Sequence, residues 1–320
     1  MRNRLVCAVI NYKTPALSVD AVSSLIKQCD FESDRVVLVD NDSGDGSVNY
    51  FRESDIADQL GNEVILIESP KNGGFSFGNN QAIEKAEAEA YLFLNSDARL
   101  ENGAIDILLK QLRDNPEIGL VGPLAVGEEG EYQASCFNDR TVANEFLRTA
   151  KTGVLTRLFG CFGVREVAQS PAGEARDVDW LSFVAVMVRG DVIRDIGLMD
   201  DGFFMYLEDN DYCRRARNKG WRVRYEPKAR VIHANKGWSG RHLERQPSFY
   251  YESRTRYFMK YYGRLGWLMA NLFWTTGRFI SILKEQLFNR PGASPIGAWK
   301  DIWTWSYGKH SLHSTQRRGK

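Results

Sequence analysis

The sequence has few cysteines, and their arrangement excludes a disulfide framework. No two of them form a CxxC pair, and an odd number cannot all pair with one another. They are Cys7, Cys29, Cys136, Cys161 and Cys213. This usage is typical of a reducing compartment. The apolar run at residues 5–10 is too short for the core of a secretory signal peptide, so we expect a cytoplasmic protein.

Two common phosphate-binding loops and a membrane-spanning run are also absent. The chain has no GxGxxG motif after its first apolar run and no GxxxxGK[ST] motif anywhere. The uncharged stretch at residues 265–277 holds thirteen residues, whereas a bilayer requires about 20. These absences argue against a dinucleotide-binding Rossmann protein, a P-loop protein and a transmembrane protein.

The small net charge of +1 conceals two regions of opposite sign. Residues 1–211 contain 19 Lys and Arg against 36 Asp and Glu, while residues 212–320 contain 23 against 5. A basic region of this kind suits a nucleic acid, an anionic membrane surface or a phosphorylated ligand. It also suits mutual neutralisation of the two regions, and the sequence leaves these alternatives open.

The first part of the chain alternates short apolar runs with helical patterns. Strands are predicted at residues 5–10, 35–39, 64–67 and 91–94, with helices at 14–29, 48–59, 77–89 and 104–115. This order predicts an α/β fold with a mostly parallel sheet and helices on both faces. Ligands bind outside the carboxyl ends of such strands, and Asn11, Asp40, Asn72 and Asp97 follow those ends.

The region after residue 115 is less regular. Strand character returns at residues 119–126 and 177–188, with a possible helix at 142–158 between them. Residues 221–226 and 229–233 resemble a short antiparallel pair divided by Pro227. Asp97 and His233 therefore both follow predicted strands, and a carboxylate with an imidazole could hold a divalent cation. A packed or surface histidine is the ordinary alternative.

Three acidic residues mark the start of a predicted helix at residues 209–219, which Gly220 ends. Glu208, Asp209 and Asp211 would lie at its N-terminus, where backbone N–H groups favour the ionised form. An ionised carboxylate there suits a general base. The alternative is that these residues only cap a surface helix.

Beyond residue 250, apolar residues recur at helical spacing, with cations on another face. The apolar residues are Phe258, Tyr261, Tyr262, Leu265, Leu268, Met269, Leu272, Phe279, Ile280 and Leu283, and the cations are Arg256, Lys260 and Arg264. Such a helix could lie on a membrane surface or pack on the rest of the protein. We therefore expect a catalytic domain at residues 1–245 and a basic amphipathic helical region at 246–320.

Taken together, these motifs resemble the family 2 glycosyltransferases with the GT-A fold, in particular the bacterial rhamnosyltransferase-like branch. The resemblance covers about residues 5–240. It depends on Val9-Ile10-Asn11-Tyr12, Val39-Asp40-Asn41-Asp42-Ser43-Gly44-Asp45-Gly46-Ser47, Asn72-Gly73-Gly74-Phe75, Gly78-Asn79-Asn80, Asn95-Ser96-Asp97, Asp179-Trp180, Phe204-Met205-Tyr206-Leu207-Glu208-Asp209-Asn210-Asp211, Arg215, Gly220-Trp221, and His233 with Ser239. Each motif is weak alone, but their joint order and spacing are specific.

The resemblance implies an inverting glycosyltransferase that uses a nucleotide-diphosphate sugar. Asp97 and His233 would hold Mg²⁺ or Mn²⁺ against the diphosphate. Asp209 would be the general base, with Glu208 and Asp211 behind it. Residues implied in donor binding are Asn11, Asp40, Asn72, Asn80, Asn95, Asp97, Trp180 and Arg215, the last of which could instead pair with Glu208 or Asp211.

The branch also implies dTDP-rhamnose as donor, with UDP- or GDP-sugars as alternatives. The acceptor would be a glycan or a polyprenyl-diphosphate-linked sugar in bacterial surface polysaccharide synthesis, beside an anionic membrane and without nucleic acid. Two positions depart from the family pattern. Asn95 stands where many relatives carry Asp, and Phe183 with Val184 replaces small residues.

Two other classes of protein compete with this interpretation. A sugar nucleotidyltransferase would share the sheet and the cation, but it requires a Gly-rich basic loop directly after the first strand, which residues 11–15 lack. A non-catalytic carbohydrate- or nucleic-acid-binding module would explain the basic C-terminal region. It gives no reason for Asp97, Asp209 and His233 to converge.

Overall fold

The computed structural model describes residues 2–150, 153–161, 168–169, 173–235, 246–288 and 298–304. The chain forms two compact units. One comprises Met1–Phe137, Ser170–Asp201 and Glu208–Arg241, and the other comprises Asn138–Gln169, Gly202–Leu207 and His242–Lys320. The domain boundary near residue 245 stays a prediction. Two stretches before that boundary, Asn138–Gln169 and Gly202–Leu207, belong to the second unit. The sequence pattern did not indicate this division.

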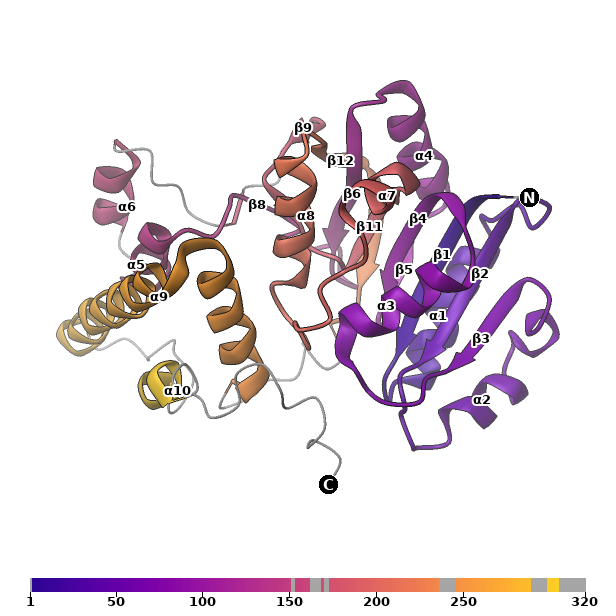
Figure 1. Ribbon diagram of the computed structural model, residues 1–320, viewed down its shortest axis with the longest axis horizontal. Helices are drawn as coiled ribbons and strands as arrows, with labels where there is room; N and C mark the ends of the chain where they lie inside the picture. Colours follow the sequence, from indigo (N-terminus) through magenta and orange to yellow (C-terminus); the bar gives the residue numbers. More distant parts are fainter. Residues whose placement is uncertain are drawn as a thin grey trace. The chain divides into compact units, whose positions relative to one another are not determined.

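The first unit is built on one large sheet, labelled in Figure 1. Its strands follow the order β3-β2-β1-β4-β11-β6-β12-β5. The four N-terminal strands run parallel: β1 (Asn3–Asn11), β2 (Asp34–Asp40), β3 (Val64–Glu68) and β4 (Ala88–Asn95). β11 (Ala185–Arg189) runs antiparallel to β4 and to β6 (Ile118–Val126). The predicted α/β fold is confirmed.

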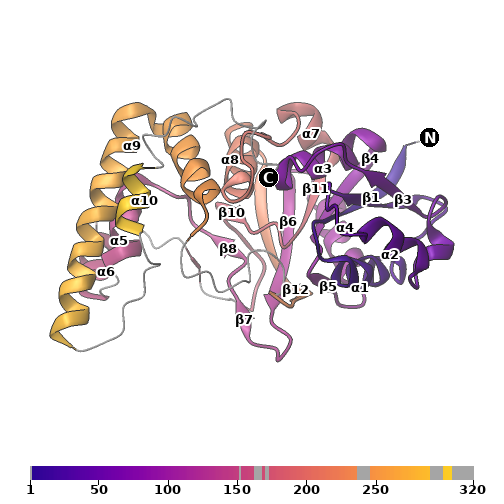
Figure 2. The ribbon, with the colours of Figure 1, turned by 90° about the horizontal axis from the view of Figure 1, so that it is seen from below.

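Helices cover both faces of this sheet, as Figure 2 shows. α1 (Pro15–Ile26) and α4 (Ala104–Asp114) share one face, where their apolar residues join the core with Leu5, Cys7 and Val9 of β1. α3 (Gly74–Lys85) lies on the other. Strand β1 is buried from Leu5 to Val9 because both faces are covered. α2 (Ser47–Glu53), α7 (Gly190–Ile196) and the short η1 (Ala57–Gln59) complete the connections.

Several predicted elements differ from the structure. The helix expected at residues 48–59 is α2 followed by η1, and the strand expected at 177–188 is divided into three short strands, of which β11 is the last. The helix expected at residues 77–89 is α3, which begins at Gly74 and ends at Lys85. Strand β4 then starts at Ala88, because pairing with β1 overrides the helical propensity of the Ala-Glu repeat. The antiparallel pair expected around Pro227 is one strand, β12 (Arg222–His233), which lies parallel to β6. A register shift between Glu226 and Arg230 accommodates the proline, which has no N–H for the ladder.

Short strands complete the first unit. β5 (Ala98–Leu100) returns beside β12, and β7 (Tyr132–Gln133) and β9 (Arg176–Asp177) pair with β6 and β12. β8 (Cys136–Phe137) and β10 (Trp180–Leu181) form a separate two-stranded sheet. α8 (Glu208–Asn218) follows the second strand region and ends before Gly220, as predicted.

The second unit is helical. α5 (Val142–Ala150) and α6 (Gly153–Gly160) replace the single helix expected at residues 142–158. α9 (Ser248–Leu287) is the long C-terminal helix, followed by α10 (Ala298–Thr304). α5 packs closely on α9 at Gly277, where a Cβ atom would lie 2.3 Å from Oγ1 of Thr149. None of the described helices combines the length and hydrophobicity needed to cross a membrane.

The predicted amphipathic pattern of α9 divides at Gly263, where the backbone leaves helical geometry with φ of 66°. Before the break, Tyr257 and Phe258 pack with Phe203 and Leu207 in a buried cluster. The predicted cations Arg256 and Lys260 lie over the Phe203 ring. After the break, Leu265, Leu272, Phe279 and Leu283 are exposed. The apolar pattern thus packs inside the unit in its first part, and four of its residues are exposed in its second.

Candidate active site

Two predicted site residues meet where β1 and β2 end. Parallel register places Asn11 opposite Asp40, and Nδ2 of Asn11 donates to Oδ1 of Asp40 at 2.7 Å and to Oγ of Ser43 at 3.0 Å. Oδ1 of Asn11 accepts from Oγ of Ser18 and from the backbone N–H of Thr14. Asn11 therefore organises the strand ends, and its own polar atoms are used within the protein.

The loop into α3 is held by side chains rather than by its backbone alone. Oδ1 of Asn72 accepts from Nδ2 of Asn41 at 3.0 Å and from the N–H of Gly74 at 3.1 Å. Asn80 exchanges two hydrogen bonds of 2.9 Å with the backbone of Met199. Asn72 thus shapes the loop that follows β3, while Asn80 fixes a distant segment to α3.

The sheet brings Asp97 and His233 together. Antiparallel pairing of β5 with β12 places His233 beside Ala98, and Nε2 of His233 lies 3.4 Å from Oδ1 of Asp97. Both side chains are buried. This approach depends on β5, a strand of only three residues. Its pairing with β12 could not be predicted from the sequence pattern.

Gln133 of β7 fixes the orientation of this histidine. Nε2 of Gln133 donates to the backbone carbonyl of His233 at 3.0 Å, so Oε1 faces Nδ1 of the imidazole at 2.7 Å. Nδ1 is then the N–H donor, and Nε2 carries a lone pair. Within the described residues, Nε2 has no hydrogen-bond partner. A lone pair that faces a carboxylate oxygen fits a cation between them.

No group of three or more His, Cys, Asp or Glu side chains in the described part of the chain could hold a metal ion. The Asp97–His233 pair would supply two ligands, and water and phosphate oxygens would have to complete the coordination. Asn95 ends β4, and its N–H donates to the carbonyl of Val184. It contributes to the turn that presents Asp97.

Trp180 lies in the separate two-stranded sheet. Its ring stacks on Phe137 with centroids 4.0 Å apart and planes inclined by 13°. The side chain is almost fully buried. The structure therefore places Trp180 in a packed aromatic pair, and a role in donor binding stays a prediction.

The acids of α8 have different environments. Glu208 is buried, and Oε2 has no hydrogen-bond partner among the described residues. Burial and the nearby Asp209 raise the pKa of Glu208 well above its usual range. This direction is opposite to the one expected at a helix N-terminus, because desolvation disfavours the charged form. Asp209 is partly exposed, and its Oδ1 accepts from the N–H of Asn210.

Asp211 pairs with Arg215, one of the two alternatives considered for this arginine. Nε of Arg215 donates to Oδ2 of Asp211 at 3.0 Å, and its other nitrogens donate to the carbonyls of Ile196 and Leu198. The guanidinium thus ties α8 to the end of α7. These contacts occupy the donors that a phosphate would need.

The two residues before Glu208 have unusual backbone geometry. Tyr206 and Leu207 have φ of 73° and 67°, in the left-handed region that non-glycine residues rarely adopt. Oγ of Ser253 donates to the carbonyl of Met205, and the Tyr206 ring stacks on Phe249. Strained residues of this kind gather at functional sites. The segment before the acids is therefore held in a fixed shape. Ser239 lies outside the described residues.

Comparison with known proteins identifies a family of similar sequences. The model of glycosyl transferase family 2 matches residues 7–165. An N-acetylglucosaminyl-diphospho-decaprenol L-rhamnosyltransferase of Mycobacterium tuberculosis is 26% identical over 75% of this chain and 78% of its own length. The dTDP-rhamnosyl transferase RfbF of Shigella flexneri is 23% identical over 73% of this chain and 70% of its own.

Solved structures share the fold at low identity. The mannosyltransferase PcManGT from Pyrobaculum calidifontis, in complex with GDP-Man and Mn²⁺, aligns with a TM-score of 0.57 and 14% identity over 96% of this chain and 84% of that one. Residues 1–349 of TarS from S. aureus align with a TM-score of 0.52 and 16% identity over 90% and 78%.

The mostly parallel sheet has the GT-A fold of these solved glycosyltransferase structures. More particularly, the chain belongs to glycosyl transferase family 2, and within that family it is similar to rhamnosyltransferases. The predicted family and enzyme class are confirmed. The nucleotidyltransferase and binding-module hypotheses lose their support.

Proposed function

We propose that this enzyme transfers L-rhamnose from dTDP-rhamnose to a glycan or lipid-linked acceptor, with inversion and with a divalent cation, in bacterial surface polysaccharide synthesis. The observation that carries the proposal is the pair formed by Asp97 and His233, because the Nε2 lone pair faces the carboxylate at 3.4 Å. Two relatives named as L-rhamnosyl or dTDP-rhamnosyl transferases support the choice of donor.

The strand ends would bind the donor. Within the described residues, the Asp40 carboxylate accepts from Nδ2 of Asn11 and from the N–H of Ser43. It could accept a further hydrogen bond from the nucleoside. Asp97 and His233 would hold Mg²⁺ or Mn²⁺, and the solved structure of PcManGT contains Mn²⁺. When bound, the cation would offset the charge that develops on the leaving diphosphate.

Asp209 would act as the general base. Its carboxylate takes the proton from an acceptor hydroxyl while that oxygen attacks the anomeric carbon of the sugar, and the bond to the nucleotide diphosphate breaks. A single displacement of this kind inverts the anomeric centre. Burial and the neighbouring Asp209 raise the pKa of Glu208, which disfavours a second negative charge beside the base.

The exposed part of α9 would meet the membrane at its cytoplasmic face. Leu265, Leu272, Phe279 and Leu283 are exposed, and Arg264 at the start of this segment is also exposed. Apolar area together with cations is the combination that binds anionic leaflets. Vesicle flotation tests this proposal: wild type should float with anionic liposomes at low salt, and a Leu272→Gln, Phe279→Gln variant should not. Equal flotation of both proteins would oppose it.

Donor binding tests the proposed function itself. Calorimetry should detect dTDP-rhamnose binding in the presence of Mn²⁺, and EDTA or His233→Ala should remove it because a two-ligand site loses half of its protein donors. The described part of the chain offers no exposed histidine near the site as a matched control. Asp201→Asn, which removes an exposed charge, is therefore the control variant. Unchanged binding in excess EDTA would remove the cation from the proposal.

A further inference from the structure

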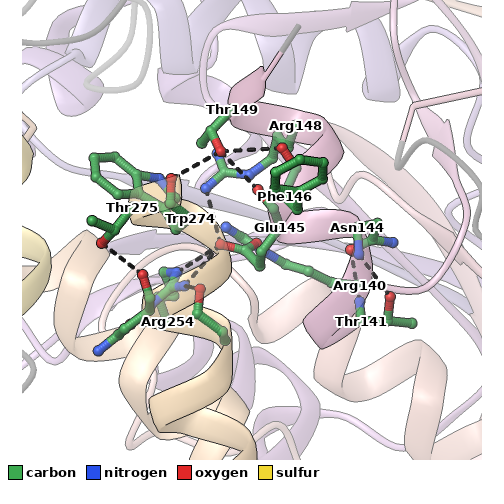
Figure 3. Close-up of polar contacts among 12 residues, drawn as sticks. Arg140, Thr141, Asn144, Glu145, Phe146, Arg148, Thr149, Arg254, Trp274 and Thr275 are labelled. Carbon is green, nitrogen blue, oxygen red and sulfur yellow. Dashed lines mark hydrogen bonds and ion pairs between the residues drawn. The ribbon is translucent and has the colours of Figure 1, made fainter. Parts of the chain in front are cut away.

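The second unit contains a buried cluster of charges (Figure 3). We call Arg140, Glu145, Arg148, Tyr250 and Arg254 the arginine cluster. Nε of Arg140 lies 2.7 Å from Oε1 of Glu145, and Nη2 of Arg254 lies 2.8 Å from Oε2. Nη2 of Arg148 reaches the same Oε2 at 3.3 Å. One carboxylate therefore faces three guanidiniums.

The charges in this cluster do not balance. Glu145 and Arg254 are fully buried, the Arg140 side chain is 8% exposed and Arg148 is 34% exposed. No other carboxylate in the described ranges forms an ion pair with these arginines. Burying unpaired charge is costly. Two positive charges in excess make this a place where an anion would be stabilised.

The three arginines have different numbers of unused donors. Arg254 donates to Glu145, to Oδ1 of Asn271 and to the carbonyl of Ala270, so it serves to join α9 to α5. Arg140 donates to Glu145 and to the Tyr250 hydroxyl at 3.1 Å. Nε of Arg148 is buried and has no partner among the described residues. The donors left for a ligand are therefore on Arg148, beside Arg140 and Tyr250.

Tyr250 responds to the same positive potential. Burial opposes ionisation of its phenol, but Arg140 and Arg148 outweigh that effect and lower the pKa of Tyr250 to about 8. Burial followed by the neighbouring arginines likewise lowers the pKa of Arg254, although Glu145 acts in the other direction. The cluster thus favours a further negative charge beside Tyr250.

We propose that Arg148, Arg140 and Tyr250 form a binding site for a phosphate or diphosphate group, which the lipid-linked acceptor supplies. The assignment of the group to the acceptor depends on the proposed function. Guanidinium donors suit phosphate oxygens because they form paired, charge-assisted hydrogen bonds. The Tyr250 ring also contacts Tyr206, with centroids 5.6 Å apart. Tyr206 stands three residues before Asp209 in the sequence, so the site adjoins the segment that leads to the base.

Calorimetry on the full chain tests the site with geranyl diphosphate as the probe. Arg148→Gln should weaken its binding about tenfold or more, since a hydrogen bond to a charged group is lost. The affinity for dTDP should change less than about twofold. Arg157→Gln, which removes an exposed cation from α6 of the same unit, should leave both affinities unchanged. Equal binding of geranyl diphosphate to wild type and Arg148→Gln would overturn the proposal.

Inorganic pyrophosphate separates the two sources of the group. Tighter binding of geranyl diphosphate than of pyrophosphate supports a lipid-linked ligand, and equal binding overturns that assignment. A bound diphosphate should also raise the pKa of Tyr250. The change is measured from tyrosinate absorption as the difference between wild type and Tyr250→Phe. No change of this signal on saturation would contradict the placement beside Tyr250.

Kinetics distinguish failure of this site from failure of the proposed function. Arg148→Gln should raise KM for a diphosphate-bearing acceptor and leave KM for a phosphate-free glycoside unchanged, with Arg148→Lys between wild type and Arg148→Gln. An equal rise for both acceptors would overturn the site even if dTDP-rhamnose is the donor. If dTDP-rhamnose is not used but geranyl diphosphate still binds through Arg148, the donor proposal fails and the site stands. Thermal unfolding verifies that each variant is folded.

Discussion

Asp40 in the first unit and Glu145 in the second are both buried carboxylates, yet their partners differ. Asp40 accepts from the Asn11 amide and from the N–H of Ser43. Glu145 accepts from three guanidiniums, which lower its pKa well below the usual range although burial opposes this. Neutral donors hold Asp40 at a strand end where a ligand can share it. Cationic donors, among them Arg254 of α9, hold Glu145 of α5. A buried carboxylate thus has neutral donors in one unit and joins two helices in the other.

This difference predicts that acids near the sheet affect activity without affecting stability. Asp209→Asn should reduce transfer by about 10² to 10⁴ because general-base catalysis is lost, and donor affinity should be preserved. Turnover and calorimetric donor binding are the measurements. Asp201→Asn, an exposed acid before the same helix, is the matched control and should retain activity. Turnover of Asp209→Asn within tenfold of wild type would remove Asp209 as the base.

The second unit should show the opposite behaviour. Glu145→Gln should lower the free energy of unfolding by about 3–5 kcal/mol, since it leaves buried guanidiniums without their carboxylate. The control is Asp177→Asn, which removes a carboxylate that also faces two arginines, Arg222 and Arg224, but at the surface. Exposed pairs contribute at most about 1 kcal/mol. Urea unfolding compares the two variants, and equal losses would show that burial does not separate them.

The sequence was sufficient to predict the strand-end residues, because parallel strands direct their carboxyl ends to one edge of the sheet. Asn11 and Asp40 were placed in this way, the acids of α8 were placed from the start of a predicted helix, and Asp97 and His233 were predicted to be neighbours. Their individual roles in binding the donor, the cation and the acceptor proton stay predictions. The raised pKa of Glu208 was missed because burial cannot be read from a helix N-terminus alone.

Other features depend on contacts that no local pattern encodes. Gln133 lies in the two-residue strand β7, and its contact with His233 spans 100 positions. Glu145 and Arg254 are 109 positions apart. Pro227 suggested a break because its ring removes a ladder hydrogen bond, yet the register shift in β12 keeps the strand continuous. Contacts between residues far apart in the sequence thus determine the orientation of His233, the pairing of Glu145 with Arg254 and the continuity of β12.

The smallest expected effect concerns the pH dependence of the second unit. Because Arg140 and Arg148 outweigh burial and lower the pKa of Tyr250 from 10 to about 8, its ionised form is more stable in the folded chain than in the unfolded chain. The resulting stabilisation is complete above pH 10 and is lost as the pH falls through about 8. One pKa unit corresponds to about 1.4 kcal/mol, so wild type should gain about 1 kcal/mol over Tyr250→Phe between pH 7.5 and 9. Urea unfolding of both proteins at each pH measures this gain.

Asp209, in the first unit, should not contribute to this gain. Asp209→Asn should therefore show the wild-type pH profile. A constant difference between wild type and Tyr250→Phe across this range would mean that the cluster does not stabilise a second anion.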